Sequence, residues 1–304
     1  MKIYILEIHP LLQPASQPFP YPAHNHDYGV EQDFLIWIKK QNLLLTSDIE
    51  EADWLYLPVF WTRWYLNHNF AIDGNGMQQL IDLTSAAVGN KKNVFTICQY
   101  DGGPNVLHEH LLSFLAARTE DKQGIDIPIL CKSHLLSPFH IEKKYTASFN
   151  GAYSTHTLRE EMKSKLENID GVYLGGYLPT RFYLRWLGFR SFNRVMRASF
   201  ISICPRGTSM NSFRFFEAMQ MGIAPCLLGD VDARPFKKYI PWDEISYYAE
   251  DVNSLEYIIR NIDKNAAIEK GKKAKQYFEN EIYYQKWCKY VLMELEEMST
   301  KPVQ

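Results

Sequence analysis

The run from Phe200 to Asp230, FISICPRGTSMNSFRFFEAMQMGIAPCLLGD, constrains the fold of this chain more than any other stretch. Its first five residues form a short apolar, β-branched run that predicts a buried strand. Pro205 and Gly207 break that strand, and the residues after them predict a helix that ends near Gly222. A second buried strand is expected over Ala224–Leu228. Strand, helix and strand in this order indicate a parallel βαβ unit, and therefore an α/β fold.

The loop and the helix start of this unit carry groups suited to an anion. A helix N-terminus after a strand offers free backbone N–H groups and the positive end of the helix dipole, which favour a phosphate. Arg206, Ser212 and Arg214 lie in this region and can donate hydrogen bonds to a diphosphate. Glu217 follows Arg214 by three residues, so both lie on one helix face. Its carboxylate could accept hydrogen bonds from a ribose diol; the alternative is a solvated ion pair with Arg214.

Residues 204–230 contain CPRGTS, SFR, EAM and GIAPCLLGD in this order. The order and spacing resemble the signature of the exostosin-family glycosyltransferases, with Cys226 where that family usually has valine. The resemblance extends over about residues 28 to 262, because further family positions are matched elsewhere. These are Glu31, Thr46, Glu51 to Asp53, Tyr56 to Pro58, Phe149 to Gly151, Arg159, Pro235 and Phe236, Ile240 and Trp242.

The resemblance implies a function and a donor site. Exostosin-family enzymes move a sugar, a hexose or a pentose, from a nucleotide sugar, usually a UDP-sugar, to a glycan hydroxyl with inversion. The donor-binding residues expected here are Arg159, Arg206, Gly207, Ser212, Arg214 and Glu217. Asp230-Val231-Asp232 has the form of a DxD metal motif, but it follows a strand of the phosphate-binding unit. We therefore expect no obligatory metal or other cofactor.

The chain is long enough for two domains, since it has 304 residues. Two successive α/β halves predict a GT-B architecture, in which two Rossmann-like domains face a central cleft, and the resemblance supports the same fold. Residues 1–140 are expected to form an acceptor-side domain and residues 141–304 a nucleotide-sugar-binding domain. The final amphipathic helix, Glu281 to Met298, is a candidate to return to the first domain.

Two carboxylates are candidates for the base that an acceptor hydroxyl requires. Asp101 ends a strand and precedes Gly102-Gly103, and it could instead only cap this turn. Glu31 begins a helix, where a carboxylate also interacts favourably with the dipole. His9, His24 and His26 are weaker candidates.

An aromatic stretch follows the strand that ends near Val59. Trp61, Arg63 and Trp64 are candidates to contact the acceptor, because aromatic rings beside polar groups can stack on sugar faces. The alternative for each ring is packing in the core.

Composition excludes several classes of function. A net charge of −2 gives no basic field for nucleic acid. The five cysteines lack zinc or disulfide spacing, so reduced thiols and a cytoplasmic location are expected. No apolar run of about 18 residues is present, so no membrane span is expected and the chain reads as a soluble catalytic module.

Two other functions compete with transfer. One is a catalytically inactive nucleotide-sugar-binding or scaffold protein, which Arg206, Arg214 and Glu217 disfavour. The other is a GT-B enzyme that acts on a sugar phosphate or as an epimerase, which the resemblance disfavours. Slow donor hydrolysis without acceptor would separate a transferase from a binding protein.

Overall fold

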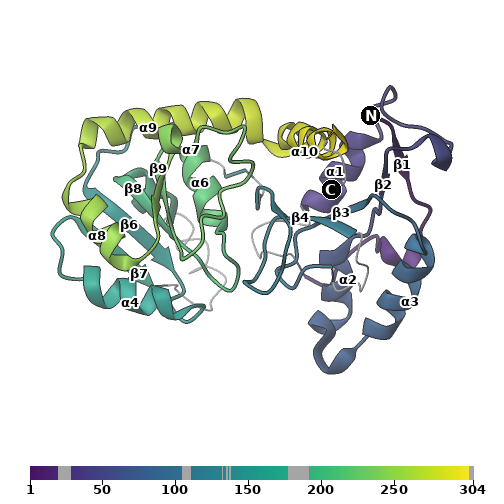
Figure 1. Ribbon diagram of the computed structural model, residues 1–304. Helices are drawn as coiled ribbons and strands as arrows, with labels where there is room; N and C mark the ends of the chain where they lie inside the picture. The colour runs from purple at the N-terminus through teal and green to yellow at the C-terminus, as the bar shows by residue number, and fades with distance from the viewer. Residues whose placement is uncertain are drawn as a thin grey trace. The chain divides into compact units, whose positions relative to one another are not determined.

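The structure is a computed structural model that describes residues 1–19, 29–104, 111–131, 133–134, 136, 138–176 and 192–300 (Figure 1). The chain divides into two compact units. Unit 1 contains Met1–Lys132 and Tyr284–Gln304, and unit 2 contains Ser133–Tyr283. The chain thus passes from unit 1 to unit 2 between Lys132 and Ser133. The sequence prediction placed this domain boundary between residues 140 and 141. His24 and His26 lie outside the described residues.

Unit 1 is built on a five-stranded sheet in the order β1-β2-β3-β4-β5, and every pairing in it is parallel. Its strands are β1 (Ile3–Ile5), β2 (Trp54–Tyr56), β3 (Val94–Cys98), β4 (Leu111–Leu115) and β5 (Ile125–Asp126). Its helices are α1 (Val30–Ile38), α2 (Trp61–Asn67), α3 (Met77–Val88) and α10 (Cys288–Thr300). Short 3₁₀ segments cover Pro10–Leu12, Ile49–Glu51, Asn69–Gly74 and Tyr284–Trp287.

The central strand of unit 1, β3, lies in the core and is apolar except at Thr96. All five residues of β3 are buried, as expected for a parallel strand covered on both faces. Its one polar side chain, Thr96, is satisfied: Thr96 Oγ1 donates to the Leu57 carbonyl at 2.9 Å and accepts from Trp61 Nε1 at 2.9 Å. Such pairing removes the cost of burying a hydroxyl group.

The C-terminal segment supplies part of this core. The Trp287 ring is fully buried and lies 6.0 Å, centroid to centroid, from Phe34 of α1. Trp54 Nε1 donates to the Leu295 carbonyl at 3.2 Å and to Ser299 Oγ at 2.8 Å. Residues that are distant in the sequence therefore complete one hydrophobic core.

Unit 2 has a second parallel sheet, in the order β10-β9-β8-β6-β7. Its strands are β6 (Tyr145–Gly151), β7 (Val172–Gly176), β8 (Ser199–Pro205), β9 (Ala224–Leu228) and β10 (Tyr247–Ala249). Its helices are α4 (Thr157–Leu166), α6 (Phe213–Met221), α7 (Trp242–Ile245), α8 (Val252–Arg260) and α9 (Lys264–Tyr277), and a π-helical turn covers Phe278–Ile282. The strand order reverses between β6 and β8, because β7 follows β6 on one side and β8 lies on the other.

The predicted βαβ unit is present as β8, α6 and β9. Helix α6 ends at Gly222, which has a left-handed φ of 71° and donates its N–H back into the helix. Helix α9 crosses close to this turn: a Cβ on Gly271 would lie 2.5 Å from the Gly222 carbonyl oxygen. A glycine at position 271 therefore permits the backbones to approach.

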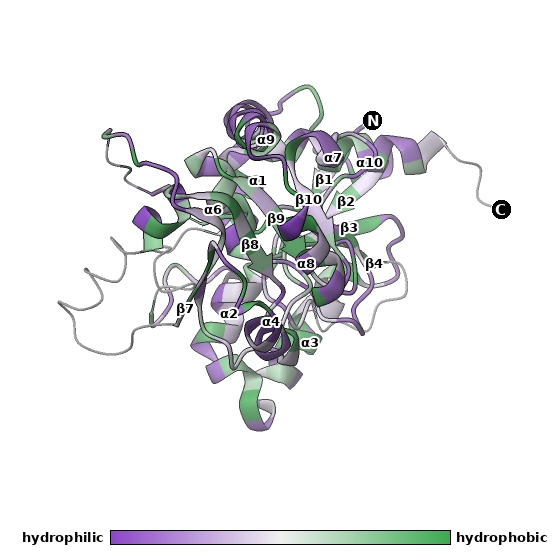
Figure 2. Ribbon diagram, turned by 90° about the vertical axis from the view of Figure 1, so that its left-hand side faces the viewer, coloured by the Kyte–Doolittle hydropathy of each residue, from purple (hydrophilic) through white to green (hydrophobic). Residues whose placement is uncertain are grey.

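The hydropathy of unit 2 differs between its strands and its outer helix (Figure 2). The strands β8 and β9 are coloured as hydrophobic, whereas α9 is mostly hydrophilic. On one side of the sheet, Met162 and Leu166 of α4 and Leu255 and Ile259 of α8 share a cluster of buried residues with β6, β8 and β9. Across the described residues, no helix combines the length and the apolarity that a bilayer crossing requires.

The predicted α/β class with two Rossmann-like domains is confirmed, because each unit is a parallel α/β sheet with its own core.

Candidate functional site

The point where the strand order of unit 2 reverses lies between β6 and β8. In open parallel sheets, ligands bind beyond the carboxyl ends of the strands at this position. The chain leaves β6 at Gly151 and leaves β8 at Pro205, and Arg206 and Gly207 follow directly. Five of the six predicted donor-site residues gather around these two strand ends and the start of α6.

Arg159 is buried and supports the loop after β8. Its Nε donates to the Arg206 carbonyl at 2.8 Å, and its Nη2 donates to the Pro205 carbonyl at 3.0 Å. Its Nη1 donates to the Ala152 carbonyl, after β6, at 2.9 Å. All three nitrogens therefore join the ends of β6 and β8. These bonds make Arg159 a support of the site's backbone, and its contact with the donor stays a prediction.

Arg214 lies on the first turn of α6, whose N-cap residue is Ser212. Its guanidinium packs over the Phe149 ring at 4.5 Å from the centroid and donates from Nη2 to the Asn150 carbonyl at 2.5 Å. A Cβ on Gly151 would lie 2.7 Å from Arg214 Nη2, so a glycine at this position makes room for the guanidinium. Among the described residues, no atom accepts a hydrogen bond from the buried Arg214 Nε.

The electrostatics of this cluster favour an anion. Burial lowers the pKa of Arg159 to about 10, and the positive charge of Arg214 contributes to the shift. Burial also lowers the pKa of Arg214, while Glu217 opposes that shift. An anion would relieve the repulsion between the two guanidiniums and replace lost solvation.

Arg206 is almost fully buried and forms an ion pair with Asp230 at the end of β9. The Asp230 side chain is about half exposed, and pairing with Arg206 lowers its pKa against an opposing effect of burial. The Arg206 backbone N–H donates to the Leu228 carbonyl at 2.8 Å. Gly207 lies close to Arg159, since a Cβ on it would be 3.1 Å from Arg159 Nη2.

Glu217 has a partner that sequence reasoning missed. Its Oε1 lies 2.7 Å from His134 Nε2, and both side chains are buried. His134 precedes Glu217 by 83 residues, and its backbone N–H donates to Gln220 Oε1 at 3.3 Å. A pair so distant in the sequence leaves no local signal. The structure thus shows that Glu217 is a buried, hydrogen-bonded carboxylate and not part of a solvated ion pair, and its contact with a ribose diol stays a prediction.

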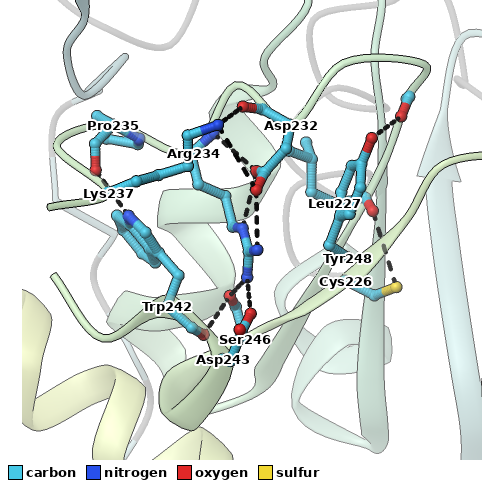
Figure 3. Close-up of polar contacts among 11 residues, drawn as sticks. Cys226, Leu227, Asp232, Arg234, Pro235, Lys237, Trp242, Asp243, Ser246 and Tyr248 are labelled. Carbon is cyan, nitrogen blue, oxygen red and sulfur yellow. Dashed lines mark hydrogen bonds and ion pairs between the residues drawn. The ribbon is translucent and has the colours of Figure 1, made fainter.

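Asp232 belongs to a network around the buried Arg234 (Figure 3). Arg234 Nε and Nη2 contact Asp232 Oδ1 and Oδ2 at 2.8 and 2.9 Å, an arrangement with two parallel bonds. Arg234 Nη1 also contacts Asp243 Oδ1 at 2.9 Å and Ser246 Oγ at 3.1 Å. Ser246 Oγ in turn donates to the Trp242 carbonyl at 2.7 Å. Each aspartate of the DxD sequence is therefore ion-paired with an arginine.

Asp101 lies in a turn beyond β3. Its Oδ1 accepts from the Gly102 N–H at 3.1 Å, and Gly103 N–H donates to the Tyr100 carbonyl at 3.0 Å. The carboxylate is partly exposed, and burial raises its pKa. This geometry fits both alternatives, the turn cap and the base, so the assignment of Asp101 stays a prediction.

Glu31 is in a different environment. It is fully buried, and its Oε1 accepts three hydrogen bonds: from Thr62 N–H at 3.1 Å, Thr62 Oγ1 at 3.0 Å and Gln99 N–H at 2.9 Å. Burial raises the pKa of Glu31 to about 7, against the lowering effect of these bonds and of Arg63. The role of Glu31 as base needs correction, because a side chain with no exposed surface joins α1 to α2 and β3 and offers no contact to an acceptor.

The acceptor-site prediction also changes. The Trp61 and Trp64 rings have exposures of 0% and 1% and lie in the core, so neither offers a face to a sugar. Arg63 is partly exposed, and its Nη1 donates to the carbonyls of Pro14 and Ala15 at 3.0 and 2.8 Å. The prediction is therefore wrong for the two tryptophans, and Arg63 holds the loop after β1.

Sequence comparisons show similarity to one family of known proteins. Residues 116–263 match the sequence model of the Exostosin GT47 domain. Exostosin-1 of Drosophila melanogaster is 27% identical over 141 residues, which cover 41% of this chain and 19% of that protein. A protein described as a probable glucuronosyltransferase of Oryza sativa subsp. japonica is 34% identical over 77 residues, or 25% of this chain and 19% of that protein. The matched part is thus under one fifth of either relative.

Solved structures resemble the chain more distantly. AviGT4, a glycosyltransferase involved in avilamycin A biosynthesis, covers 99% of this chain with a TM-score of 0.39 and 8% identity, and 98% of that structure is matched. TarM covers 75% of this chain with a TM-score of 0.39 and 13% identity, and 59% of it is matched. The sequence comparisons point to one family: residues 116–263 of this chain match the exostosin GT47 domain and resemble part of Exostosin-1.

Proposed function

We propose that this chain is an inverting glycosyltransferase that moves a hexose or pentose from a nucleotide sugar, with a UDP-sugar as the expected donor, to a hydroxyl group of a glycan. The observation that carries the proposal is Arg214. Its guanidinium interacts with that of Arg159, which holds the Arg206 carbonyl, and it binds the Asn150 carbonyl at the switch point of a parallel sheet. Its Nε has no acceptor among the described residues.

A diphosphate is the anion that best suits this cluster. The leaving group of the reaction develops negative charge, and fixed donors that face this charge stabilise the transition state. Arg214 and the first N–H groups of α6 supply such donors on one side, and Arg206 and Gly207 lie at the end of β8. Glu217, oriented by His134, is the group we assign to a ribose hydroxyl.

Inversion requires one displacement. The acceptor oxygen attacks the anomeric carbon, the bond from that carbon to the diphosphate oxygen breaks, and a base takes the proton of the acceptor hydroxyl. Asp101 of unit 1 is our candidate for this base. Its pKa, raised by burial, favours proton uptake during the reaction.

We propose that the reaction needs no metal. Asp230 pairs with Arg206, and Asp232 pairs with Arg234 through two hydrogen bonds. A divalent ion at these carboxylates would compete with two buried arginines, and the guanidiniums already supply positive charge.

The test of the donor site is Arg214→Ala, with Arg260→Ala as a matched control, because Arg260 is an exposed arginine of the same unit. We expect Arg214→Ala to lower the transfer rate by about 10²–10³, in the range for removal of one transition-state donor. Titration calorimetry with UDP should show weaker binding for Arg214→Ala only. UDP binding equal to that of the unmodified chain would contradict the proposal. Donor hydrolysis by the unmodified chain would exclude an inactive binding protein.

We also propose a reducing compartment, with the cytoplasm as the expected location. All five cysteines are buried. Burial raises the pKa of Cys204 to about 12, so this thiol is held in its unreactive form. Labelling of the native chain with a thiol reagent should modify few of these groups.

A further inference from the structure

Four aromatic rings form a continuous row in unit 1, which we call the aromatic ladder: Tyr65, Tyr100, Phe70 and Phe19. Tyr65 and Tyr100 are stacked, with ring centroids 4.1 Å apart. Tyr100 and Phe70 are nearly parallel at 6.3 Å, and Phe70 lies 6.1 Å from Phe19. The rings come from α2, the turn beyond β3, the 3₁₀ segment after α2 and the loop after β1. Four separate parts of the chain thus converge on one row.

The ladder leads from the core to the surface. Tyr65 is 1% exposed, and Phe19 is 45% exposed. Tyr100 and Phe70 lie between them and are partly exposed. If these rings only filled the core, all of them would be buried. Instead, the row begins at the buried Tyr65 and ends at the exposed Phe19. Tyr65 is itself anchored, since its hydroxyl group donates to the Gly103 carbonyl at 3.4 Å.

The ladder adjoins the predicted base. Tyr100 directly precedes Asp101, and burial together with the charge of Asp101 raises the pKa of the Tyr100 hydroxyl. A Cβ on Gly102 would lie 2.8 Å from Tyr100 Cε1, so a glycine at this position lets the ring lie over the turn. The turn therefore presents a carboxylate and an aromatic ring side by side.

The backbone that carries Phe70 adopts a costly conformation. Asn69, Phe70, Ala71 and Asp73 have φ values of 51°, 59°, 56° and 57°, all in the left-handed region that non-glycine residues avoid. Several such residues together persist only where their surroundings fix them, and they concentrate at functional sites. This segment places Phe70 against Tyr100.

We propose that the aromatic ladder is the platform on which one sugar ring of the acceptor glycan stacks, next to Asp101. This proposal rests on the proposed function and adds its acceptor site. The C–H face of a pyranose fits the electron-rich face of an aromatic ring, and the carboxylate of Asp101 can accept hydrogen bonds from the hydroxyl groups at the sugar's edge. Flat rings beside a carboxylate suit a neutral glycan, which offers both a C–H face and hydroxyl donors, better than an apolar side chain, which offers no donor.

The test compares glycan binding by variants of the full chain. The probe is an immobilised panel of neutral oligosaccharides of glucose, galactose, xylose and N-acetylglucosamine. Phe70→Leu and Tyr100→Leu keep apolar volume and remove the ring, Tyr100→Phe keeps the ring, and Tyr257→Leu removes an exposed ring of unit 2 as a control. We expect about tenfold weaker binding of the recognised oligosaccharide for the first two variants and unchanged binding for the other two.

UDP binding is measured on the same samples. It should stay unchanged in all four variants, because the ladder is in unit 1 and the arginine cluster is in unit 2. Equal glycan binding by Phe70→Leu, Tyr100→Leu and the unmodified chain would overturn the proposal, as would the absence of glycan binding by an unmodified chain that binds UDP. If the unmodified chain does not bind UDP, that result would instead count against the proposed function.

Discussion

Glu31→Gln should make unit 1 more stable at alkaline pH and leave it nearly unchanged in acid. The folded state raises the pKa of Glu31 from 4.5 to about 7, because burial disfavours the charged form. Between these two pH values the folded chain binds more protons at this site than the unfolded chain does. Stability therefore falls as the pH rises through this window. Above the folded pKa, the contribution of the protonated Glu31 is fully lost.

The magnitude follows from the shift. At 1.36 kcal/mol for each unit of pKa, the loss approaches about 3 kcal/mol above pH 7. Glutamine avoids this loss, since it carries no charge. It also keeps the three bonds that reach Oε1, because Oε2 accepts only one longer bond, from the Thr62 N–H at 3.2 Å. The lowering effect of Arg63 on the Glu31 pKa is already part of the net shift.

The assay is hydrogen exchange of peptides that contain Thr62 and Gln99, measured between pH 5 and pH 8 and corrected for intrinsic exchange. A local readout is needed because a chain of two units need not unfold in one step. Glu50→Gln is the control, since Glu50 is an exposed carboxylate of the same unit. The unmodified chain and Glu50→Gln should lose protection as the pH rises, and Glu31→Gln should not. Equal pH dependence in all three proteins would refute the reasoning.

Three further outcomes are expected. Asp101→Asn should keep UDP binding and lower transfer by about 10²–10⁴, as for removal of a general base; normal transfer would leave Asp101 as a turn cap. Arg159→Lys should lower the melting temperature and weaken UDP binding, because one ammonium group cannot reach three carbonyls and each unpaired buried carbonyl costs about 1–3 kcal/mol; an unchanged melting temperature would contradict this. Transfer should survive EDTA, and loss of activity that Mn²⁺ restores would return Asp230 and Asp232 to the role of metal ligands.

The sequence predicted best what depends on neighbouring residues. The strand over Ala224–Leu228 has the predicted bounds, and α6 ends beside Gly222 as expected. These elements follow from apolar runs and from a glycine that accepts a left-handed φ, and both signals lie within a few residues.

The sequence predicted least well what depends on distant contacts. Glu31 and Thr62 meet across 31 residues, and His134 and Glu217 meet across 83. Whether a carboxylate at a helix start faces solvent or the core depends on such contacts. A catalytic carboxylate and a buried one therefore show the same sequence pattern, and the prediction for Glu31 could not distinguish them. The same applies to Trp61, whose Nε1 is satisfied by Thr96 inside the core.

The return of Tyr284–Gln304 to unit 1 has a consequence for synthesis of the chain. Unit 2 is continuous from Ser133 to Tyr283, so it is complete as soon as that stretch has left the ribosome. Residues 1–132 must wait longer, because Phe34 and Trp54 have partners in a segment that is made after unit 2. Until then the surface that will hold Trp287 is exposed and open to aggregation. Unit 1 therefore finishes folding after unit 2, although most of unit 1 is made before it.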